Sequence, residues 1–240
     1  MVKIVVTGKL PKNPIVVEGF PSKGFVSTIA TNYMVRELGM KLVGYIEVEE
    51  LKSIIIVRDY VPLRPIRIYV KDNLVLIYSE VIVPYHSIPA LSAALNKWLD
   101  SLKPKLIVLM AGISGTEPSK GHQILGVTSK KELASMLKGL KLKVLEDGVL
   151  TGVSSDILMH CVEKNMPAIG LMVETEYNPD ALAATTMLEI LNKLLKIKID
   201  IDSLKKMGNE IENEFRSIMK QMKKGREGYV KLEECGHMYG

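Results

Sequence analysis

The feature that most constrains the fold of this chain is the alternation of short apolar runs, rich in Val and Ile, with longer segments of helical periodicity. The strand-like runs occupy residues 14–20, 41–48, 106–113, 124–128 and 167–174. The helical segments between and after them occupy residues 25–38, 88–102, 154–165 and 178–196. Strands and helices that alternate in this way form a mostly parallel sheet with helices on both faces. We therefore predict an α/β fold.

One pair of strands departs from this alternation. Residues Ile66 to Val70 and Leu74 to Val83 are joined by the short polar segment Lys71-Asp72-Asn73. Asp and Asn tolerate the left-handed backbone that tight turns require, and the connection is too short for a helical crossover. This pair is predicted to be an antiparallel hairpin.

Two helix starts carry hydroxyl side chains of the kind that cap helices. Ser129 stands three residues before Glu132, the spacing of a capping box, in which Ser accepts from one backbone amide and Glu from another. Ser154 or Ser155 is expected to cap the helix that runs through Asn165.

The chain changes character after residue 198. Apolar residues then recur at steps of three or four on an otherwise charged helix, and they are Leu204, Met207, Ile211, Phe215, Ile218 and Met222. Such a stripe is buried either against the helix's own domain or in an oligomer interface, and the pattern alone favours neither. Three parts are predicted: an α/β domain over residues 1–198, an amphipathic helical arm over 199–225, and a flexible tail over 226–240, loosened by Gly225 and Gly228.

No motif indicates catalysis, a cofactor or a metal. The segment Gly19-Phe-Pro-Ser-Lys-Gly24 has the glycine spacing of a phosphate loop, but Phe25 and Val26 stand where Lys and Ser or Thr would be required. A tight strand-to-helix turn explains these glycines better.

The loop from Ala111 to Gln123 is the best candidate for a small-molecule pocket. It follows the most apolar strand, where doubly wound sheets place their ligands, and it offers Ser114, Glu117, Lys120 and His122. No motif of a known ligand site accompanies these residues, so a plain surface loop is the preferred interpretation.

The charge and the composition argue against two classes of partner. The net charge of +5 is concentrated late, in Lys220, Lys223, Lys224 and Arg226, and few aromatic residues are present to stack on bases, so nucleic acid is not an expected partner. No apolar run is long enough to span a membrane, and no signal peptide is visible. Two widely separated cysteines, Cys161 and Cys235, suggest reduced thiols and a cytoplasmic protein.

The last three residues, Met238-Tyr239-Gly240, have the chemistry of a docking element. Met is an apolar plug, Tyr an aromatic ring with a hydrogen-bonding tip, and Gly240 carries the terminal carboxylate. This tail resembles the hydrophobic-Tyr-any tail by which activators and assembly chaperones dock onto the α ring of the proteasome.

The body of the chain supports the same comparison. Gly19-Phe-Pro-Ser-Lys-Gly-Phe-Val26, Thr151-Gly-Val-Ser-Ser-Asp-Ile-Leu158, Pro167-Ala-Ile-Gly-Leu-Met-Val-Glu-Thr175 and Asn178-Pro-Asp-Ala-Leu-Ala-Ala184 resemble segments of the proteasome assembly chaperone 2 family. The resemblance extends from about Pro14 to Lys196. It implies an α/β fold related to the nucleoside phosphorylases, no nucleotide requirement, and self-association.

The resemblance implies an ATP-independent chaperone, not an enzyme, that binds proteasome α subunits or the α ring through Met238, Tyr239 and Gly240. A homo-oligomer is expected, with a tetramer favoured. Two alternatives stay open: a small-molecule-binding protein or enzyme that uses a phosphorylase-like pocket, and an adaptor that recruits clients to the finished proteasome.

Overall fold

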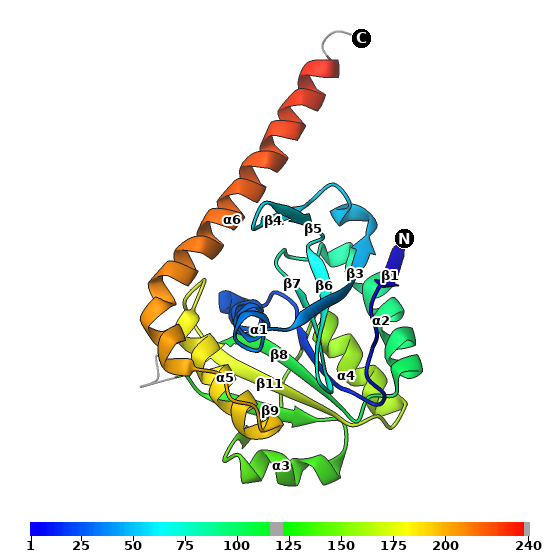
Figure 1. Cartoon of the computed structure of the whole chain (residues 1–240), viewed down its shortest axis with the longest axis vertical. Helices are drawn as coiled ribbons and strands as arrows, with labels where there is room; N and C mark the ends of the chain where they lie inside the picture. Colours follow the sequence, from blue (N-terminus) through cyan, green and yellow to red (C-terminus); the bar gives the residue numbers. More distant parts are fainter. Residues whose placement is uncertain (116–121, 238–240) are drawn as a thin grey trace.

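The structure is a computed structural model that describes residues 1–115 and 122–237, with only the helical backbone described for residues 226–237. Within the described residues, one large sheet has nine strands (Figure 1). Their spatial order is β1 (Val2–Val6), β3 (Lys41–Val48), β6 (Ile66–Lys71), β7 (Leu74–Ser79), β2 (Ile15–Gly19), β8 (Leu106–Ser114), β11 (Ala168–Thr175), β9 (Ile124–Thr128) and β10 (Lys143–Val144). The predicted α/β class is confirmed.

Parallel pairing is concentrated in the centre of the sheet. The pairs β7–β2, β2–β8 and β8–β11 are parallel, as is the pair β9–β10 at one edge. The pairs β1–β3, β3–β6, β6–β7 and β9–β11 are antiparallel. The sheet is therefore mixed, and the parallel arrangement expected from the alternation of strands and helices describes its central strands.

Helices cover both faces of the sheet. Helix α1 (Val26–Glu37) and helix α5 (Ala181–Leu195) lie on one face, and α2 (Ile88–Leu102) and α4 (Val153–Glu163) lie on the other (Figure 1). Consecutive residues of β8 alternate between the two cores, because Val108 and Met110 join the first, whereas Ile107 and Leu109 join the second. A strand that is buried on both faces needs apolar residues at every position, which explains the unbroken apolar run of β8.

The predicted hairpin is confirmed. Lys71 of β6 pairs with Leu74 of β7, so Asp72 and Asn73 form a two-residue turn, and Asp72 has a left-handed φ of 50°. The sequence did not predict β1, which pairs with β3 at the edge of the sheet, or the separate hairpin of β4 (Ile56–Arg58) and β5 (Val61–Leu63).

The predicted serine caps are wrong. Ser129 does not cap a helix: its hydroxyl donates to Met166 O at 2.7 Å and accepts from Ala168 N at 2.8 Å, which ties β9 to the start of β11. The helix after it, α3 (Ala134–Gly139), begins beyond a short 3₁₀ turn at Lys131–Leu133. Helix α4 begins after Gly152, so Ser154 and Ser155 lie inside its first turn.

The three remaining short 3₁₀ turns of the described chain are Lys23–Phe25, Glu49–Leu51 and Tyr85–Ser87.

The C-terminal helix α6 (Ile201–His237) is longer than predicted. Its backbone is helical through residues 226–237, where we expected a flexible tail, and Gly225 does not interrupt it. No proline occurs between residues 201 and 237, and a glycine in a helix interior costs only about 1 kcal/mol. In Figure 1 the helix leaves the body and projects well beyond it. Among the described residues, no helix is both long and apolar enough to cross a membrane.

Candidate functional site

The docking residues that the sequence predicts, Met238, Tyr239 and Gly240, lie outside the described residues. The structure does describe the helix that leads to them. Helix α6 ends at His237, immediately before Met238 in the sequence. The predicted docking tail therefore follows directly on a long projecting helix.

The first half of α6 packs against the body. Leu204, Ile211 and Phe215 are 0, 7 and 3% exposed and belong to the core on the α1–α5 face of the sheet. The Phe215 ring lies 6.2 Å from that of Phe25, centroid to centroid. Three of the six stripe residues are thus covered by the chain's own domain, which is one of the two arrangements that the pattern allowed.

The other three stripe residues are less covered. Met207 is 39% exposed, and Ile218 and Met222 are half-buried. Since Met222 packs against the core on the α2–α4 face of the sheet, Met207 and Ile218 are the members of the stripe that a second chain could contact. The oligomer interface stays a prediction, and the packing restricts it to this part of the stripe.

A chain of ion pairs also holds α6 to the body. Arg58 of β4 pairs with Glu214 of α6 and, at 2.6 Å, with Glu80, which is buried and pairs in turn with the buried Arg67. At the base of the helix, Tyr33 Oη donates to Asp200 O at 2.7 Å. The direction of the arm is therefore fixed by apolar and polar contacts together.

The glycine segment between β2 and α1 is an architectural turn. Gly24 and Phe25 both have left-handed φ angles, of 69° and 51°. The turn is held by a line of hydrogen bonds: Ser27 Oγ donates to Phe20 O at 2.5 Å, the Ser22 and Ser27 hydroxyls lie 3.0 Å apart, and Gly112 N donates to Ser22 Oγ at 2.8 Å. The preferred interpretation of these glycines, a tight strand-to-helix turn, is confirmed.

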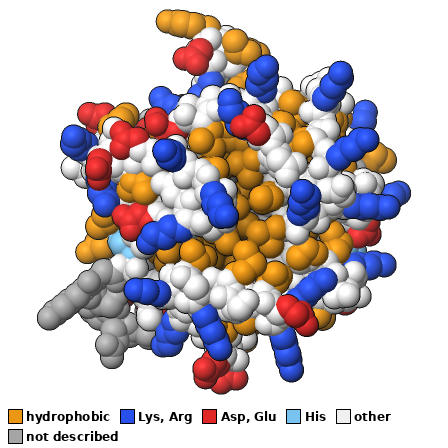
Figure 2. All heavy atoms as spheres, turned by 60° about the horizontal axis from the view of Figure 1, so that its bottom comes forward, with side chains coloured by type: hydrophobic (Ala, Val, Ile, Leu, Met, Phe, Trp, Pro, Cys, Tyr) orange, Lys and Arg blue, Asp and Glu red, His pale blue; other side chains and the backbone are white. Residues whose placement is uncertain are grey.

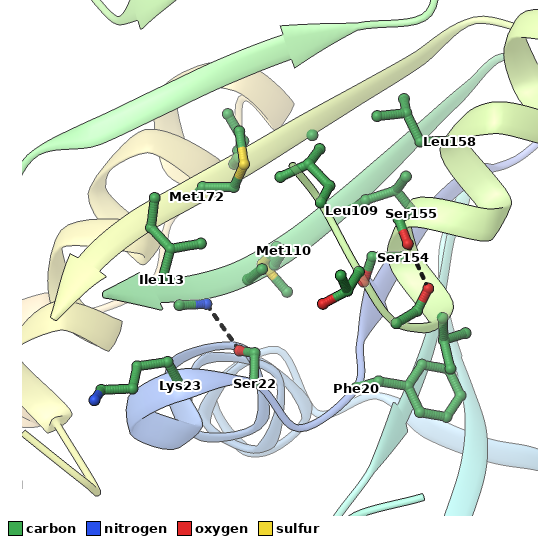
Figure 3. A pocket seen from close by; sticks show the side chains of 18 of the residues that line it. Phe20, Ser22, Lys23, Leu109, Met110, Ile113, Ser154, Ser155, Leu158 and Met172 are labelled. Carbon is green, nitrogen blue, oxygen red and sulfur yellow. Dashed lines mark hydrogen bonds between the residues drawn. The ribbon is translucent and has the colours of Figure 1, made fainter. Parts of the chain in front are cut away.

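This turn forms one wall of a large cavity at the carboxyl ends of β2, β8 and β11. The cavity has a volume of about 710 Å³. Figure 3 labels several of the lining residues: Phe20 and Ser22 from the turn, Leu109, Met110 and Ile113 from β8, Met172 from β11, and Ser154 and Leu158 from α4. In Figure 2, the face turned forward carries hydrophobic side chains at its centre, surrounded by Lys and Arg.

Ser154 connects the cavity to a buried carboxyl group. Its hydroxyl donates to Glu18 Oε2 at 2.8 Å, and the other carboxylate oxygen of Glu18 accepts from Phe20 N at 2.8 Å. Glu18 is 1% exposed, and burial raises its pKa from 4.5 to about 7, against the opposing effect of these two hydrogen bonds. A carboxyl group that titrates near neutrality thus lies directly behind the cavity wall.

The loop that the sequence singled out contributes only in part. Ser114 lines the cavity, whereas His122 faces the start of α5, with Nδ1 3.0 Å from Glu174 O and Nε2 3.6 Å from the buried Asp180. Glu117 and Lys120 lie outside the described residues. Sequence reasoning missed Glu18 and Ser154, and the one signal available was an acidic residue within the apolar run of β2.

The remaining reactive side chains do not form a site in the part of the chain that the structure describes. Cys161 is fully buried in α4, and burial raises its pKa to about 12, as expected of a small core residue rather than a nucleophile. Over the same residues, no group of three or more His, Cys, Asp or Glu side chains could hold a metal ion.

Comparison with known proteins places the chain in a family. The model of the PAC2 family matches residues 16–219. An uncharacterised protein of Methanocaldococcus jannaschii is 30% identical over 223 residues, which cover 91% of this chain and 92% of the relative.

Solved structures agree with this match. PbaA of Pyrococcus furiosus, an archaeal homologue of proteasome-assembly chaperone, superposes with a TM-score of 0.85 and 27% identity, covering 94% of this chain and all of PbaA. PbaB of the same organism, an archaeal proteasome activator, shares the fold with a TM-score of 0.75 and 21% identity, over 91% of this chain and 98% of PbaB. The family that the resemblance indicated is thereby confirmed: the chain belongs to the PAC2 family.

Proposed function

We propose that this protein is an ATP-independent chaperone of proteasome assembly, which binds α subunits or the α ring through Met238, Tyr239 and Gly240. The observation that carries the proposal is the geometry of α6, a helix anchored on the body at one end with the predicted docking residues directly after the other. The similarity to PbaA supports the choice of partner.

The arm gives the tail its reach. At a rise of about 1.5 Å per residue, the 37 residues of α6 extend over about 55 Å. Because Leu204, Ile211 and Phe215 fix the first half of the helix, the second half extends away from the body as far as His237. A tail carried on a helix loses less conformational freedom on binding than one at the end of a disordered linker, and this lowers the entropic cost of docking.

The tail itself offers three recognition groups. Met238 and Tyr239 can fill apolar pockets, and the phenol tip of Tyr239 can form a hydrogen bond there. Since Gly240 has no side chain, it contributes only its carboxylate, which a cation of the partner would pair with. Tyr239 is the expected hot spot, because truncating a buried aromatic anchor commonly costs about 2 kcal/mol or more of binding free energy.

Self-association would strengthen a weak tail. We propose a homo-oligomer, with a tetramer favoured, in which several tails meet several equivalent pockets of one α ring. Linked binding of this kind raises avidity by about a hundredfold or more over a single tail, provided that the arms span the distance between pockets. The proposal places the protein in the cytoplasm.

The experiment that tests the proposal is a pull-down of purified α subunits and of finished core particles, with and without ATP. Deletion of residues 238–240, or Tyr239→Ala, should abolish capture of α subunits. Both variants should keep the number of chains in the oligomer and the circular dichroism spectrum of the wild type. Tyr60→Ala is the matched control, because Tyr60 is fully exposed on the β4–β5 turn. If the variant that lacks residues 238–240 captures α subunits as well as the wild type does, the docking claim is contradicted.

The same experiment separates the chaperone from the adaptor. Binding to free α subunits is expected of an assembly chaperone, whereas capture of finished particles alone would identify an adaptor or activator. Dependence of capture on ATP would contradict the ATP-independent mechanism.

A further inference from the structure

The cavity at the carboxyl ends of β2, β8 and β11 has the size of a small-molecule site. Its volume of about 710 Å³ falls within the range of about 300–1,000 Å³ that is usual for ligand pockets. Its walls come from the β2–α1 turn, strands β8, β9 and β11, residues near the start of α2, and the segment from Leu145 through the first turns of α4. Open space of this volume is unusual in a protein interior, which is close-packed elsewhere.

The walls are apolar and pre-formed. Leu109 and Met172 are 2% and 3% exposed and lie on the same face of the sheet, because Leu109 pairs with Gly170 and Ala111 pairs with Met172. Leu158, Leu145 and Leu150 complete the apolar lining from the other side. The thioether of Met172 suits an aromatic ring, because polarisable sulfur makes favourable contacts with ring edges.

One polar group of this lining is positioned by a buried partner. The Ser154 hydroxyl donates to Glu18, which lies behind the wall, and its oxygen can still accept a hydrogen bond. The neighbouring Ser155 differs, because its hydroxyl donates to Gly152 O at 2.7 Å, within its own helix turn (Figure 3). Ser154 is therefore the side chain that Glu18 orients at the cavity.

The charges of the lining do not select an ion. Among the described residues, the lining contains one cation and one anion, Lys23 and Glu174. The Lys and Arg side chains on the surrounding face (Figure 2) are solvated, and charges in water are screened beyond about 10 Å at 0.1 M salt. A neutral occupant fits this lining better than a charged one.

We infer that this cavity binds a small neutral molecule with a ring-sized apolar body and one hydrogen-bond donor, which it presents to the Ser154 hydroxyl. The apolar body would lie against Leu109, Ile113 and Met172. This site does not depend on the tail, so it is independent of the proposed docking to the proteasome.

The donor is tested with a matched pair of probes, indole and 1-methylindole, titrated into the full-length protein by calorimetry. Indole should bind at one site per chain and several-fold more tightly than 1-methylindole, which lacks the N–H group. Ser154→Ala should remove this difference, and Ser155→Ala, the matched control one residue away, should keep it. A preference for indole that survives Ser154→Ala would overturn the role of Ser154.

A cavity-filling variant tests the location even if Ser154→Ala disturbs the fold. Leu150 is half-buried in the lining, so Leu150→Trp should fill the cavity and weaken both probes at least tenfold. Leu182→Trp is the control, because Leu182 is 57% exposed on α5. Equal binding by Leu150→Trp and the wild type would place the probes elsewhere and overturn the inference.

Two further results would also overturn it. Tighter binding of indole-3-acetate than of indole would identify an anion site instead. The second is a wild-type protein that binds neither indole nor 1-methylindole, together with a Leu150→Trp variant that no longer captures α subunits. This pair of results would identify the cavity as a pocket for a protein partner.

Discussion

Glu18 is the residue whose environment departs most from what its side chain prefers. A carboxylate is normally solvated, yet Glu18 is 1% exposed in the middle of the sheet, and burial raises its pKa from 4.5 to about 7. Two hydrogen bonds, from Phe20 N and Ser154 Oγ, offset only part of the desolvation cost.

Replacement of Glu18 should change how stability depends on pH. In the unfolded chain the carboxyl group ionises near pH 4.5, and in the folded chain near pH 7. The stability that Glu18 contributes is therefore fully present below pH 4.5 and is lost as pH rises through 7, a loss of about 3 kcal/mol. Glu18→Gln should remove this loss, because glutamine does not ionise. The free energy of unfolding of the variant minus that of the wild type should therefore be larger at pH 8 than at pH 5.

Urea denaturation at the two pH values measures this difference. Ser155→Ala is a suitable control, because Ser155 lies beside Ser154 but does not contact Glu18. A difference between wild type and Glu18→Gln that is the same at pH 5 and pH 8 would contradict the raised pKa.

Gly112 is required because β8 passes close to the β2–α1 turn. A Cβ at this position would overlap the carbonyl oxygen of Lys23. Gly112→Ala should therefore destabilise the protein by about 1–3 kcal/mol or more, as overpacking does. Gly139→Ala is the control, since a Cβ there would meet no atom within 4 Å. Thermal unfolding of the two variants should separate them clearly, and equal midpoints would contradict the close approach.

At the scale of elements, α6 combines two roles on one helix. Its first half is part of the domain core, and its second half extends beyond the body. The strained left-handed Phe25 contributes to this arrangement, because its ring packs on Phe215 of the arm. The turn after β2 thus shapes both the cavity and the base of the arm.

The Phe215 contact should determine how firmly the arm is held. Phe215→Ala removes a ring that is 3% exposed, and such a truncation costs about 3–5 kcal/mol. Amide hydrogen exchange should accelerate in residues 201–215 more than in the central strands. Met207→Ala is the matched control on the same helix, since Met207 is 39% exposed and its exchange should stay near wild type. Unchanged protection of residues 201–215 in Phe215→Ala would show that the arm is held by other contacts.

At the scale of the whole molecule, the test of oligomerisation must use residues of α6 that lie outside the core of the single chain. Changes at Ile211 or Phe215 would disturb the fold of the single chain, because both are core residues. Met207 is exposed and Ile218 is half-buried, and neither belongs to the core. Substitutions at these two positions therefore test association without removing a core side chain.

The double variant Met207→Asp with Ile218→Asp should reduce the mass measured by light scattering to that of one chain, 26.7 kDa. Each substitution would bury a charge in an apolar interface. Asn209→Asp with Gln221→Asp adds the same charge at exposed positions of the same helix and should leave the oligomer intact. An unchanged mass for the first variant would exclude this part of the stripe from the interface.

Features that depend on local pattern could be predicted from the sequence alone. The alternation of apolar runs and helical segments determined the α/β class, and Asp72-Asn73 determined the β6–β7 hairpin. The chemistry of Met238-Tyr239-Gly240 predicts a docking element, and this stays a prediction. These inferences need only neighbours a few residues apart, because side-chain periodicity and turn preference are local properties of the backbone.

Features that join residues far apart in the sequence could be seen only in the folded chain. Ser154 looked like a helix cap from its neighbours, but it bonds Glu18, 136 residues earlier, and Ser129 bonds the start of β11 instead of a helix end. The stripe of α6 could face its own domain or another chain until Leu204, Ile211 and Phe215 were seen in the core. A cavity, a buried carboxyl group and a covered helix face all depend on which segments the folded chain brings together, and no local pattern carries that information.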